Sequence, residues 1–256
     1  MAPRGCRRSA LFVVLPYFNE ERWLPQALAA LAAQSDPDFC LALVDNASTD
    51  LSAVLAAEAA RIHPELCVHP VSEGQKGTGA ASDTGFRYAI AQGARWVART
   101  DADCLPDRDW VVTLRRALVD DGLEFVAGRM RPRRDEGGSW LDGFALPAMI
   151  RLAEVYVRLA RRGPPYLCPS FLVAGNNLAL SAELYLRSGG FPRSRLEDVS
   201  EDRVLADRVR RVTARAQRRP AMVVYNSARR VRAYGYLNTL RWYRNRGYGG
   251  ERVDIR

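Results

Sequence analysis

Apolar and polar residues along the first hundred positions follow two alternating patterns. Two short runs that are almost entirely apolar, residues 10–16 and 39–45, have the length of strands buried on both faces, and 66–71 and 95–100 are expected as a third and a fourth strand. Between them, apolar residues recur at helical spacing over 22–34, 50–61 and 84–92, and Asp50 is placed to cap the second helix. Strands that alternate with helices predict an α/β fold, with a mostly parallel central sheet and flanking helices.

The regular alternation ends after residue 109. The later pattern predicts a helix to residue 120, a strand over 124–131 and a loop rich in Arg, Asp, Glu and Gly that can move. A long basic amphipathic helix is expected over 140–162, and a further strand over 171–180 that crosses the turn Gly175-Asn176-Asn177. We therefore expect a single domain of two halves, 10–110 and 111–230, followed by a lid or tail over 231–256.

Composition adds an ordinary globular core and a basic surface. The chain has 256 residues, 48% of them hydrophobic, which suffices for one large α/β domain or two small ones. A formal net charge of +9 indicates a surface that attracts anions such as nucleotides, nucleic acid or acidic lipid headgroups. Nearly all of this charge is arginine and alanine is abundant, a pattern that genomic compositional bias also produces. The charge therefore does not choose among these partners.

Cysteine usage and hydropathy indicate a reducing compartment and no membrane span. The five cysteines are scattered and never spaced as CxxC, so neither a disulfide framework nor a zinc ribbon is indicated; they are Cys6, Cys40, Cys67, Cys104 and Cys168. No apolar run approaches the ~20 residues that a membrane span needs, and the basic N-terminus lacks the features of a signal peptide. We expect a cytoplasmic protein, with peripheral membrane contact as an alternative.

Two carboxylates follow the fourth expected strand, in Asp101-Ala102-Asp103. Ligands of parallel sheets bind at this carboxyl edge. Hard cations such as Mg²⁺ and Mn²⁺ prefer oxygen ligands and keep open positions for phosphates, so the pair is a candidate metal site. Asp is also common in turns and at helix starts, so the motif on its own is weak.

Further polar residues are expected near the same edge. Asp45 ends the second strand and can accept hydrogen bonds from a base or ribose. Residues 74–79, Gly-Gln-Lys-Gly-Thr-Gly, fail both the P-loop and the dinucleotide-binding patterns, but Lys76 is the only lysine of the chain and sits in a glycine turn. The acidic pairs Glu197-Asp198 and Glu201-Asp202 precede a helical pattern, where helix capping is the ordinary role.

Taken in order, six motifs resemble those of family 2 glycosyltransferases with the GT-A fold. They are residues 16–20 (PYFNE), 44–50 (VDNASTD), 101–103 (DAD), 175–177 (GNN), 189–191 (GGF) and 201–205 (EDRVL). The resemblance covers about residues 10 to 211. It implies a GT-A-type Rossmann-like sandwich, whose first half binds a nucleotide sugar and whose second half binds the acceptor. The donor is usually a UDP-sugar, and glucose is our first expectation because of its prevalence in the family.

The resemblance also assigns residues. Pro16, Tyr17, Glu20 and Asp45 would contact the nucleotide, Asp101 would face ribose or metal, and Asp103 would hold Mn²⁺ or Mg²⁺. Asp202 resembles the base of inverting members, while Asn176, Asn177 and Glu201 look like the floor near the sugar and acceptor. Lys76 is a further candidate contact to the nucleotide.

The chain departs from the family at two places. Ser82-Asp83 replaces the usual Arg-Asn, which puts a nucleotide contact at Asp83 in doubt, and no histidine follows His69 to serve as a late metal ligand. Arg241, Arg244 and Arg246 lie among aromatic residues, and we expect them to close over the diphosphate as a lid. Two alternatives stay open: a sugar-phosphate nucleotidyltransferase, and a non-enzymatic basic protein that binds nucleic acid or membrane. With the enzyme interpretation, no nucleic-acid partner is expected.

Overall fold

The computed structural model describes residues 9–133, 165–193 and 200–227, and the single positions 135, 148, 151, 152, 155 and 229. The first part of the chain contains β1 (Leu11–Tyr17), α1 (Leu24–Ala32), β2 (Cys40–Asp45), α2 (Ser52–Ile62), β3 (Cys67–Ser72), α3 (Thr78–Ala91) and β4 (Trp96–Arg99). The later elements are β5 (Cys104–Pro106), α4 (Trp110–Arg115), the π-helical turn η1 (Arg116–Asp120), β6 (Phe125–Pro132), β7 (Leu178–Ser181), α6 (Ala182–Ser188), α7 (Glu201–Val212) and β8 (Ala216–Asn226).

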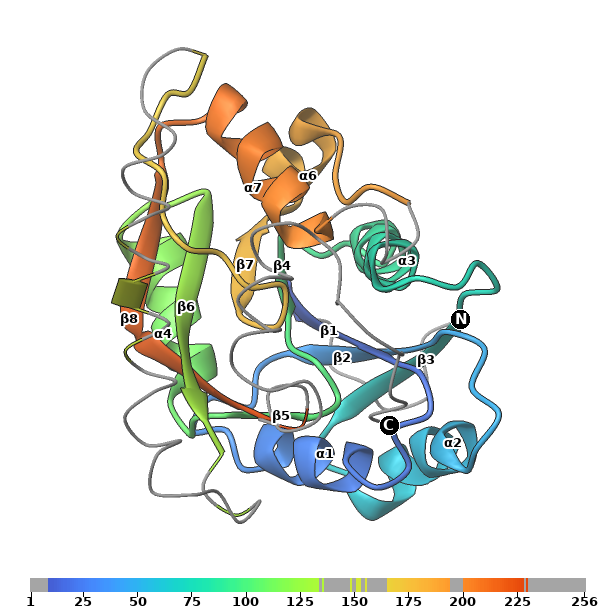
Figure 1. Cartoon of the computed structure of the whole chain (residues 1–256). Helices are drawn as coiled ribbons and strands as arrows, with labels where there is room; N and C mark the ends of the chain where they lie inside the picture. The colour runs from blue at the N-terminus through green and yellow to red at the C-terminus, as the bar shows by residue number, and fades with distance from the viewer. Residues whose placement is uncertain are drawn as a thin grey trace.

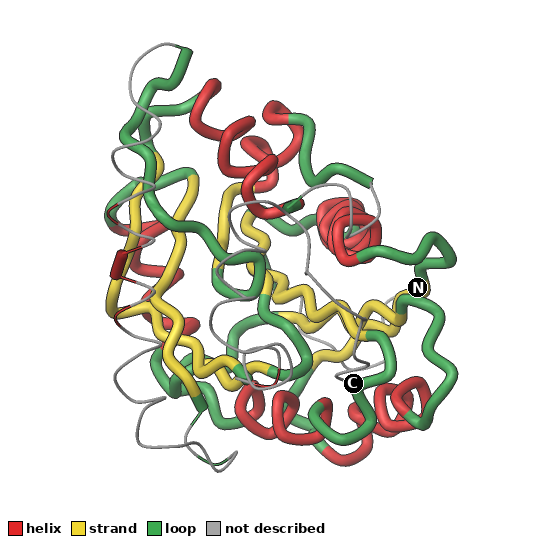
Figure 2. Tube along the Cα trace, in the orientation of Figure 1, coloured by secondary structure: helices red, strands yellow, loops and turns green. Residues whose placement is uncertain are grey.

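The described strands form one sheet in the order β3-β2-β1-β4-β7-β6-β8-β5. The first four of these run parallel, as the alternating pattern predicts, with Tyr17 of β1 beside Asp45 of β2. The strand β7 is antiparallel to both β4 and β6, and β5 is antiparallel to β8. The expected sandwich with a mostly parallel sheet is confirmed, and helices lie on both faces of the sheet (Figures 1 and 2).

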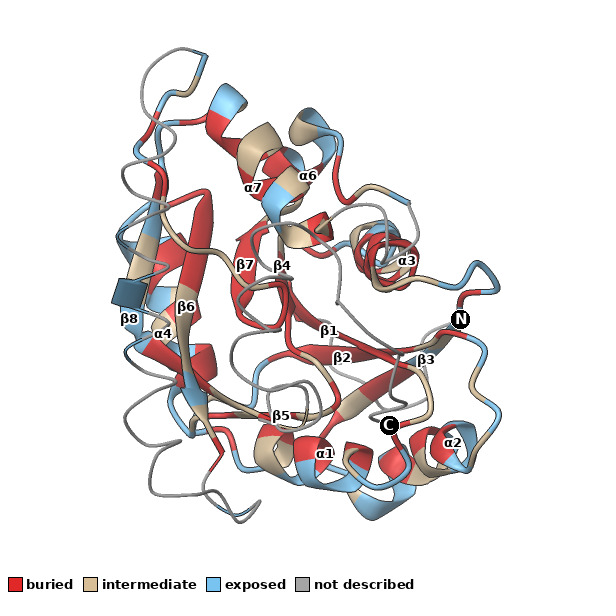
Figure 3. Cartoon of the chain, in the orientation of Figure 1, coloured by how far each residue is buried: buried red, intermediate tan, exposed pale blue. Residues whose placement is uncertain are grey.

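Alternate residues of β1 enter two hydrophobic cores. Leu11, Val13 and Leu15 pack with α1, α2 and α4 on one face, whereas Phe12 and Val14 pack with α3, α6 and α7 on the other. Figure 3 shows the central strands buried, while α1 and α2 expose their outer sides. Burial on both faces explains why the strand reads as a continuous apolar run.

Several elements differ from the sequence prediction. The helix α3 begins at Thr78, six residues before the expected start. Its first turns consist of small residues that pack closely against neighbouring segments, so they show no helical period of large apolar residues. A Cβ on Gly79 would lie 2.3 Å from the carbonyl oxygen of Pro192. The strand expected over 171–180 is wrong in its first part: only β7 is extended, and Asn177 N donates to Ala174 O in a turn. The elements β5, α6 and β8 were not predicted from the sequence.

Other expectations lie outside the described residues. They include most of the amphipathic helix over 140–162, the acids Glu197 and Asp198, and the tail with Arg241, Arg244 and Arg246. Within the described part of the chain, no helix combines the length and apolarity needed to cross a membrane.

Candidate active site

The loops that follow β1 and β2 hold each other at the carboxyl edge of the sheet. The side-chain carbonyl of Asn19 accepts the backbone N–H of Thr49 at 2.8 Å, and Glu20 N donates to Ser52 Oγ at 2.7 Å. Asn19 and Ala47 both have positive φ, 53° and 62°, and an alanine in this region is strained by about 1 kcal/mol. The two loops are therefore fixed together before any ligand binds.

Asp45 and Asp50 have different tasks in this region. Asp45 ends β2, and one of its carboxylate oxygens accepts the N–H of Ser48 at 3.0 Å. The N-cap residue of α2 is Leu51, one position after the predicted Asp50, but Asp50 still accepts the N–H of Ser52, the first residue of the helix, at 2.9 Å. The neighbouring Tyr17 is buried at the end of β1, and burial together with the charge of Asp45 raises its pKa.

Asn46 fixes the glycine-rich loop beside β2. Its side-chain amide donates to the carbonyl oxygens of Glu73 and Gln75, at 3.1 and 2.8 Å, and accepts the N–H of Gly77 at 2.8 Å. Lys76 is exposed on this loop, with Nζ 4.6 Å from the centre of the Phe18 ring. Since Phe18 directly follows β1, Lys76 lies next to the segment expected to hold the nucleotide.

Arg229 connects the β1 loop to the aspartate pair. Its guanidinium donates to both carboxylate oxygens of Glu20, one of them at 2.9 Å, and lies 3.2 Å from Asp103 Oδ2. Burial raises the pKa of Glu20 to about 7, with a contribution from the charges of Asp103 and Asp101 and an opposing one from Arg229. The structure thus brings Glu20 and Asp103 together around one cation.

Arg99 connects the aspartate pair to the second acidic motif. Its Nε lies 3.0 Å from Asp101 Oδ1, and its Nη1 lies 3.2 Å from Glu201 Oε1 at the start of α7. The side chain is 1% exposed, and burial alone would lower its pKa, yet the charges of Asp101 and Glu201 raise it. Arg99 therefore stays charged inside the protein.

Asp202 lies in the first turn of α7, beside Glu201. Its carboxylate accepts the N–H of Gly175 at 3.2 Å and that of Arg203 at 2.7 Å. Burial, followed by the charge of Glu201, raises the pKa of Asp202 to about 6, while these N–H groups and Arg99 act in the opposite direction. The carboxylate is consequently ionised at neutral pH and remains close to its protonation range, as a general base requires.

Three residues of the expected site differ in what their side chains can reach. Asp83 is 1% exposed, and its carboxylate accepts hydrogen bonds from Tyr185 Oη at 2.8 Å and Arg87 Nε at 2.9 Å. The side-chain amide of Asn177 is bonded to Trp110 Nε1 and to backbone carbonyls of β6 and β8. We therefore propose structural roles for Asp83 and Asn177 in place of ligand contact. Asn176 donates to Cys104 Sγ, next to Asp103, and its buried Oδ1 has no hydrogen-bond partner in the described structure.

The residues around the aspartate pair fit a hard divalent cation. The linked side chains Glu20, Asp101, Asp103, Glu201 and Asp202 supply five carboxylates, while Arg99 and Arg229 supply two guanidinium groups. Oxygen ligands suit Mg²⁺ or Mn²⁺, and the excess of negative charge favours a further cation. Asp101 and Asp103 are the residues that would hold it.

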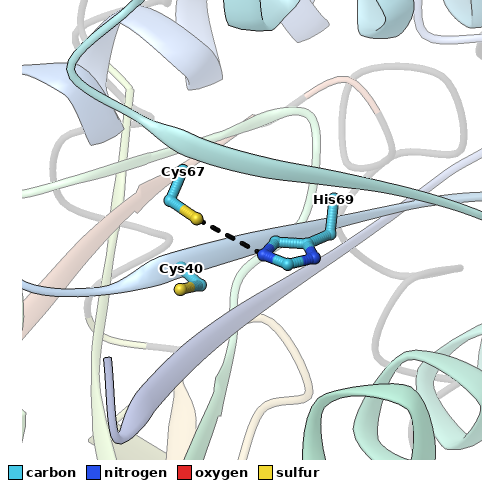
Figure 4. A group of neighbouring side chains, drawn as sticks. All are labelled: Cys40, Cys67 and His69. Atoms are coloured by element: carbon cyan, nitrogen blue, oxygen red, sulfur yellow. Dashed lines mark hydrogen bonds between the residues drawn. The ribbon is translucent and has the colours of Figure 1, made fainter. Parts of the chain in front are cut away.

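A second group with metal-ligand atoms lies at the opposite edge of the sheet. Within the described residues, Cys40, Cys67 and His69 bring their ligand atoms within 4.8 Å of one another (Figure 4). Cys40 and Cys67 begin β2 and β3, whereas Asp45 ends β2, so the group is remote from the candidate site. Cys67 is disulfide-bonded and so has no thiolate to offer a metal, and the scattered cysteine spacing gave no sign of this bond.

The roles of Arg99 and Arg229 and the anchoring role of Asn46 were not predicted from the sequence. Arg99 is a single positive charge at the end of an apolar strand, two residues before an aspartate, and this isolated charge was the available signal. Arg229 lies 209 residues from Glu20, and no local pattern connects the two.

Comparison with known proteins identifies the family of this arrangement. The protein-family model described as "Glycosyl transferase family 2" matches residues 12–163 of this chain, which include the loops after β1, β2 and β4. The chain belongs to glycosyl transferase family 2. This membership confirms the family expected from the motifs, and it favours glycosyl transfer over nucleotidyl transfer and over non-enzymatic binding.

Relatives and solved structures agree with this membership. An uncharacterized glycosyltransferase of Mycobacterium tuberculosis is 32% identical over 72% of this chain and 75% of its own length. A mannosyltransferase from Pyrobaculum calidifontis, solved with GDP-Man and Mn²⁺, has a TM-score of 0.65 and 26% identity over 96% of this chain. TarS of Staphylococcus aureus, solved with UDP-GlcNAc, shares the fold with a TM-score of 0.62 and 18% identity over 85% of this chain. The match spans 66% of the mannosyltransferase and 58% of the TarS chain.

Proposed function

We propose that this family 2 member transfers a hexose from a UDP-sugar to an acceptor by a metal-assisted inverting displacement. One observation carries the proposal: carboxylates from the β1 and β4 loops and from α7 meet at one edge of the sheet, linked by Arg229 and Arg99. In an open α/β sheet, this carboxyl edge is where ligands bind.

The donor half supplies the nucleotide contacts. We assign Pro16, Tyr17, Glu20 and Asp45 to the nucleoside, and Lys76 to the phosphates or base edge, because these residues surround the joined β1 and β2 loops. A divalent cation on Asp101 and Asp103 would neutralise the diphosphate, which is otherwise repelled by the carboxylates. Asn176 and Glu201 border the position of the transferred sugar and the acceptor.

Asp202 takes the acceptor proton in the proposed reaction. The acceptor hydroxyl gives its proton to the Asp202 carboxylate as the hydroxyl oxygen forms a bond to the anomeric carbon. The bond from that carbon to the diphosphate oxygen breaks, and the electron pair leaves with UDP. Attack from the side opposite to the leaving group inverts the anomeric configuration.

Thermal-shift measurements test the donor class. UDP, UDP-glucose, UDP-GlcNAc and GDP-mannose are compared with and without Mn²⁺, since a ligand that binds only the folded state raises its stability. UDP-glucose is the first donor to follow for turnover, with Asp103→Ala as the variant that lacks one metal ligand. A guanosine donor that stabilises the protein while uridine donors do not would contradict the donor assignment, and stabilisation by none of them would contradict the function.

A further inference from the structure

Arg99 contacts both acidic motifs with one side chain. Nε and Nη2 face Asp101, at 3.0 and 3.4 Å, while Nη1 faces Glu201 at 3.2 Å. Asp101 belongs to the loop after β4 and Glu201 to the first turn of α7, 100 positions later in the chain. The guanidinium therefore spans from the donor side of the site to the helix that carries Asp202.

The surroundings leave Arg99 little freedom to move. The side chain is 1% exposed, and its Cζ lies 5.5 Å from the centre of the Phe191 ring. A Cβ placed on Gly175 would lie 2.8 Å from Nη1, so the backbone of Gly175 packs directly against the guanidinium. The same residue donates its N–H to Asp202 at 3.2 Å. The guanidinium, Gly175 and Asp202 consequently form one packed unit.

We propose that Arg99 is a positioning residue for glycosyl transfer, which holds the aspartate pair of the donor site and the acidic pair of α7 at a set separation. The inference rests on the proposed function. A guanidinium is a rigid planar fork that satisfies two carboxylates at once, whereas a lysine ammonium is a point charge on a flexible stem. Small errors in the placement of a base relative to a reacting carbon reduce the rate strongly.

Charge supports the same role. Four groups face Asp202. Glu201 and the Arg203 N–H come from the same helix, α7, Arg99 comes from β4, and the Gly175 N–H comes from the loop before β7. The positive charge of Arg99 lowers the pKa of Asp202. Loss or displacement of this charge should raise that pKa and move the acid limb of the pH–rate profile to higher pH.

Two substitutions test the contact of Arg99 with Asp101 and Glu201 in different ways. Arg99→Lys keeps the charge but cannot span both carboxylates, and Gly175→Ala keeps Arg99 but crowds its guanidinium. We expect both proteins to fold and to transfer or hydrolyse the donor on the order of 10-fold more slowly or worse. Arg210→Lys is the matched control, because Arg210 is also a buried arginine but contacts Cys168 O at the far end of α7.

A second readout is independent of turnover. The pKa of the Asp202 carboxyl is measured by NMR with ¹³C-labelled aspartate, and its signal is assigned with Asp202→Asn. We expect this pKa to rise in Arg99→Lys and Gly175→Ala and to stay unchanged in Arg210→Lys. Folded variants with wild-type turnover and an unchanged Asp202 titration would overturn the proposal. If wild-type protein turns over none of the tested donors, the proposed function fails, and the NMR titration alone still decides whether Arg99 controls Asp202.

Discussion

Replacing Asp202 by Asn should remove transfer and at the same time stabilise the protein at alkaline pH. The pKa of this carboxyl is about 6 in the folded protein, against an ordinary value of 3.8 for an aspartate. The folded state therefore binds the proton more tightly than the unfolded state does. Folding stability contributed by this group is highest below pH 4 and decreases as the pH rises through about 6.

The size of the effect follows from the shift. Two pKa units correspond to about 3 kcal/mol, an upper bound for the stability lost when Asp202 ionises. Asn keeps an acceptor for one of the two N–H groups, from Gly175 and Arg203, but leaves the other without a carboxylate oxygen. We therefore expect Asp202→Asn to gain about 1–2 kcal/mol at pH 8, or about 2–8 °C in Tm for a chain of this size.

The assay compares unfolding and transfer over the same pH range. The Tm difference between Asp202→Asn and wild type should be largest at pH 8 and should decrease steadily towards pH 4. Transfer by the wild type should fall about tenfold per pH unit below pH 6, and Asp202→Asn should lose roughly 10²–10⁴-fold in rate. The wild-type product should have inverted configuration. A variant that is less stable than wild type at pH 8, or that still transfers sugar, would refute the assignment of a half-buried, ionised base.

The remaining predictions concern the donor site. UDP binding should require Mn²⁺ or Mg²⁺. Asp103→Ala should lose this metal dependence, whereas Asp45→Ala should weaken UDP binding both with and without metal. Calorimetry in the presence and absence of chelator distinguishes the effects of the two variants. Arg229→Met should bind Mn²⁺ more tightly than wild type when nucleotide is absent, because the guanidinium occupies Asp103 at 3.2 Å; unchanged or weaker binding would count against this competition. Lys76→Ala should weaken UDP binding by a few-fold while Tm stays near the wild-type value, since Lys76 is exposed and contacts the Phe18 ring; a normal UDP affinity would remove Lys76 from the site.

The hydrophobic pattern was sufficient to predict the first half of the fold. The strand β1 is apolar throughout because both of its faces are buried, and α1 shows a clear helical period. The start of α3 was missed because its Gly-Ala-Ala-Ser sequence packs by being small and has no polar face to contrast. The strand β8 carries Arg218, Arg219 and Pro220 in its first half. This stretch lacks the apolar pattern of a strand, so the 11-residue strand was not predicted from the sequence.

The candidate site shows the same division. Asp45 and Asp101 could be placed because strand ends of a parallel sheet meet at one edge. The arginines could not, because their partners come from distant parts of the chain: Arg99 meets a residue 102 positions away, and Arg229 one 209 positions away. Asn177 is the converse case: its place in a family motif indicated sugar contact, while its amide atoms form hydrogen bonds within the protein, which is why we propose a structural role for it.

Substitution of the acidic and of the basic residues in this cluster should change the stability of the protein in opposite directions. This difference distinguishes the proposed base from the residue that positions it. Asp202 is held ionised near Glu201 at a cost in stability, so its removal relieves repulsion and abolishes transfer. Arg99 compensates Asp101 and Glu201 in a buried setting, so its removal leaves two carboxylates without a cation and lowers stability and transfer together. In the proposed mechanism the carboxylate in the unfavourable place takes part in the reaction directly, whereas an arginine that satisfies its neighbours can act only through them. Stability measured beside activity therefore distinguishes the proposed base from the residue that positions it.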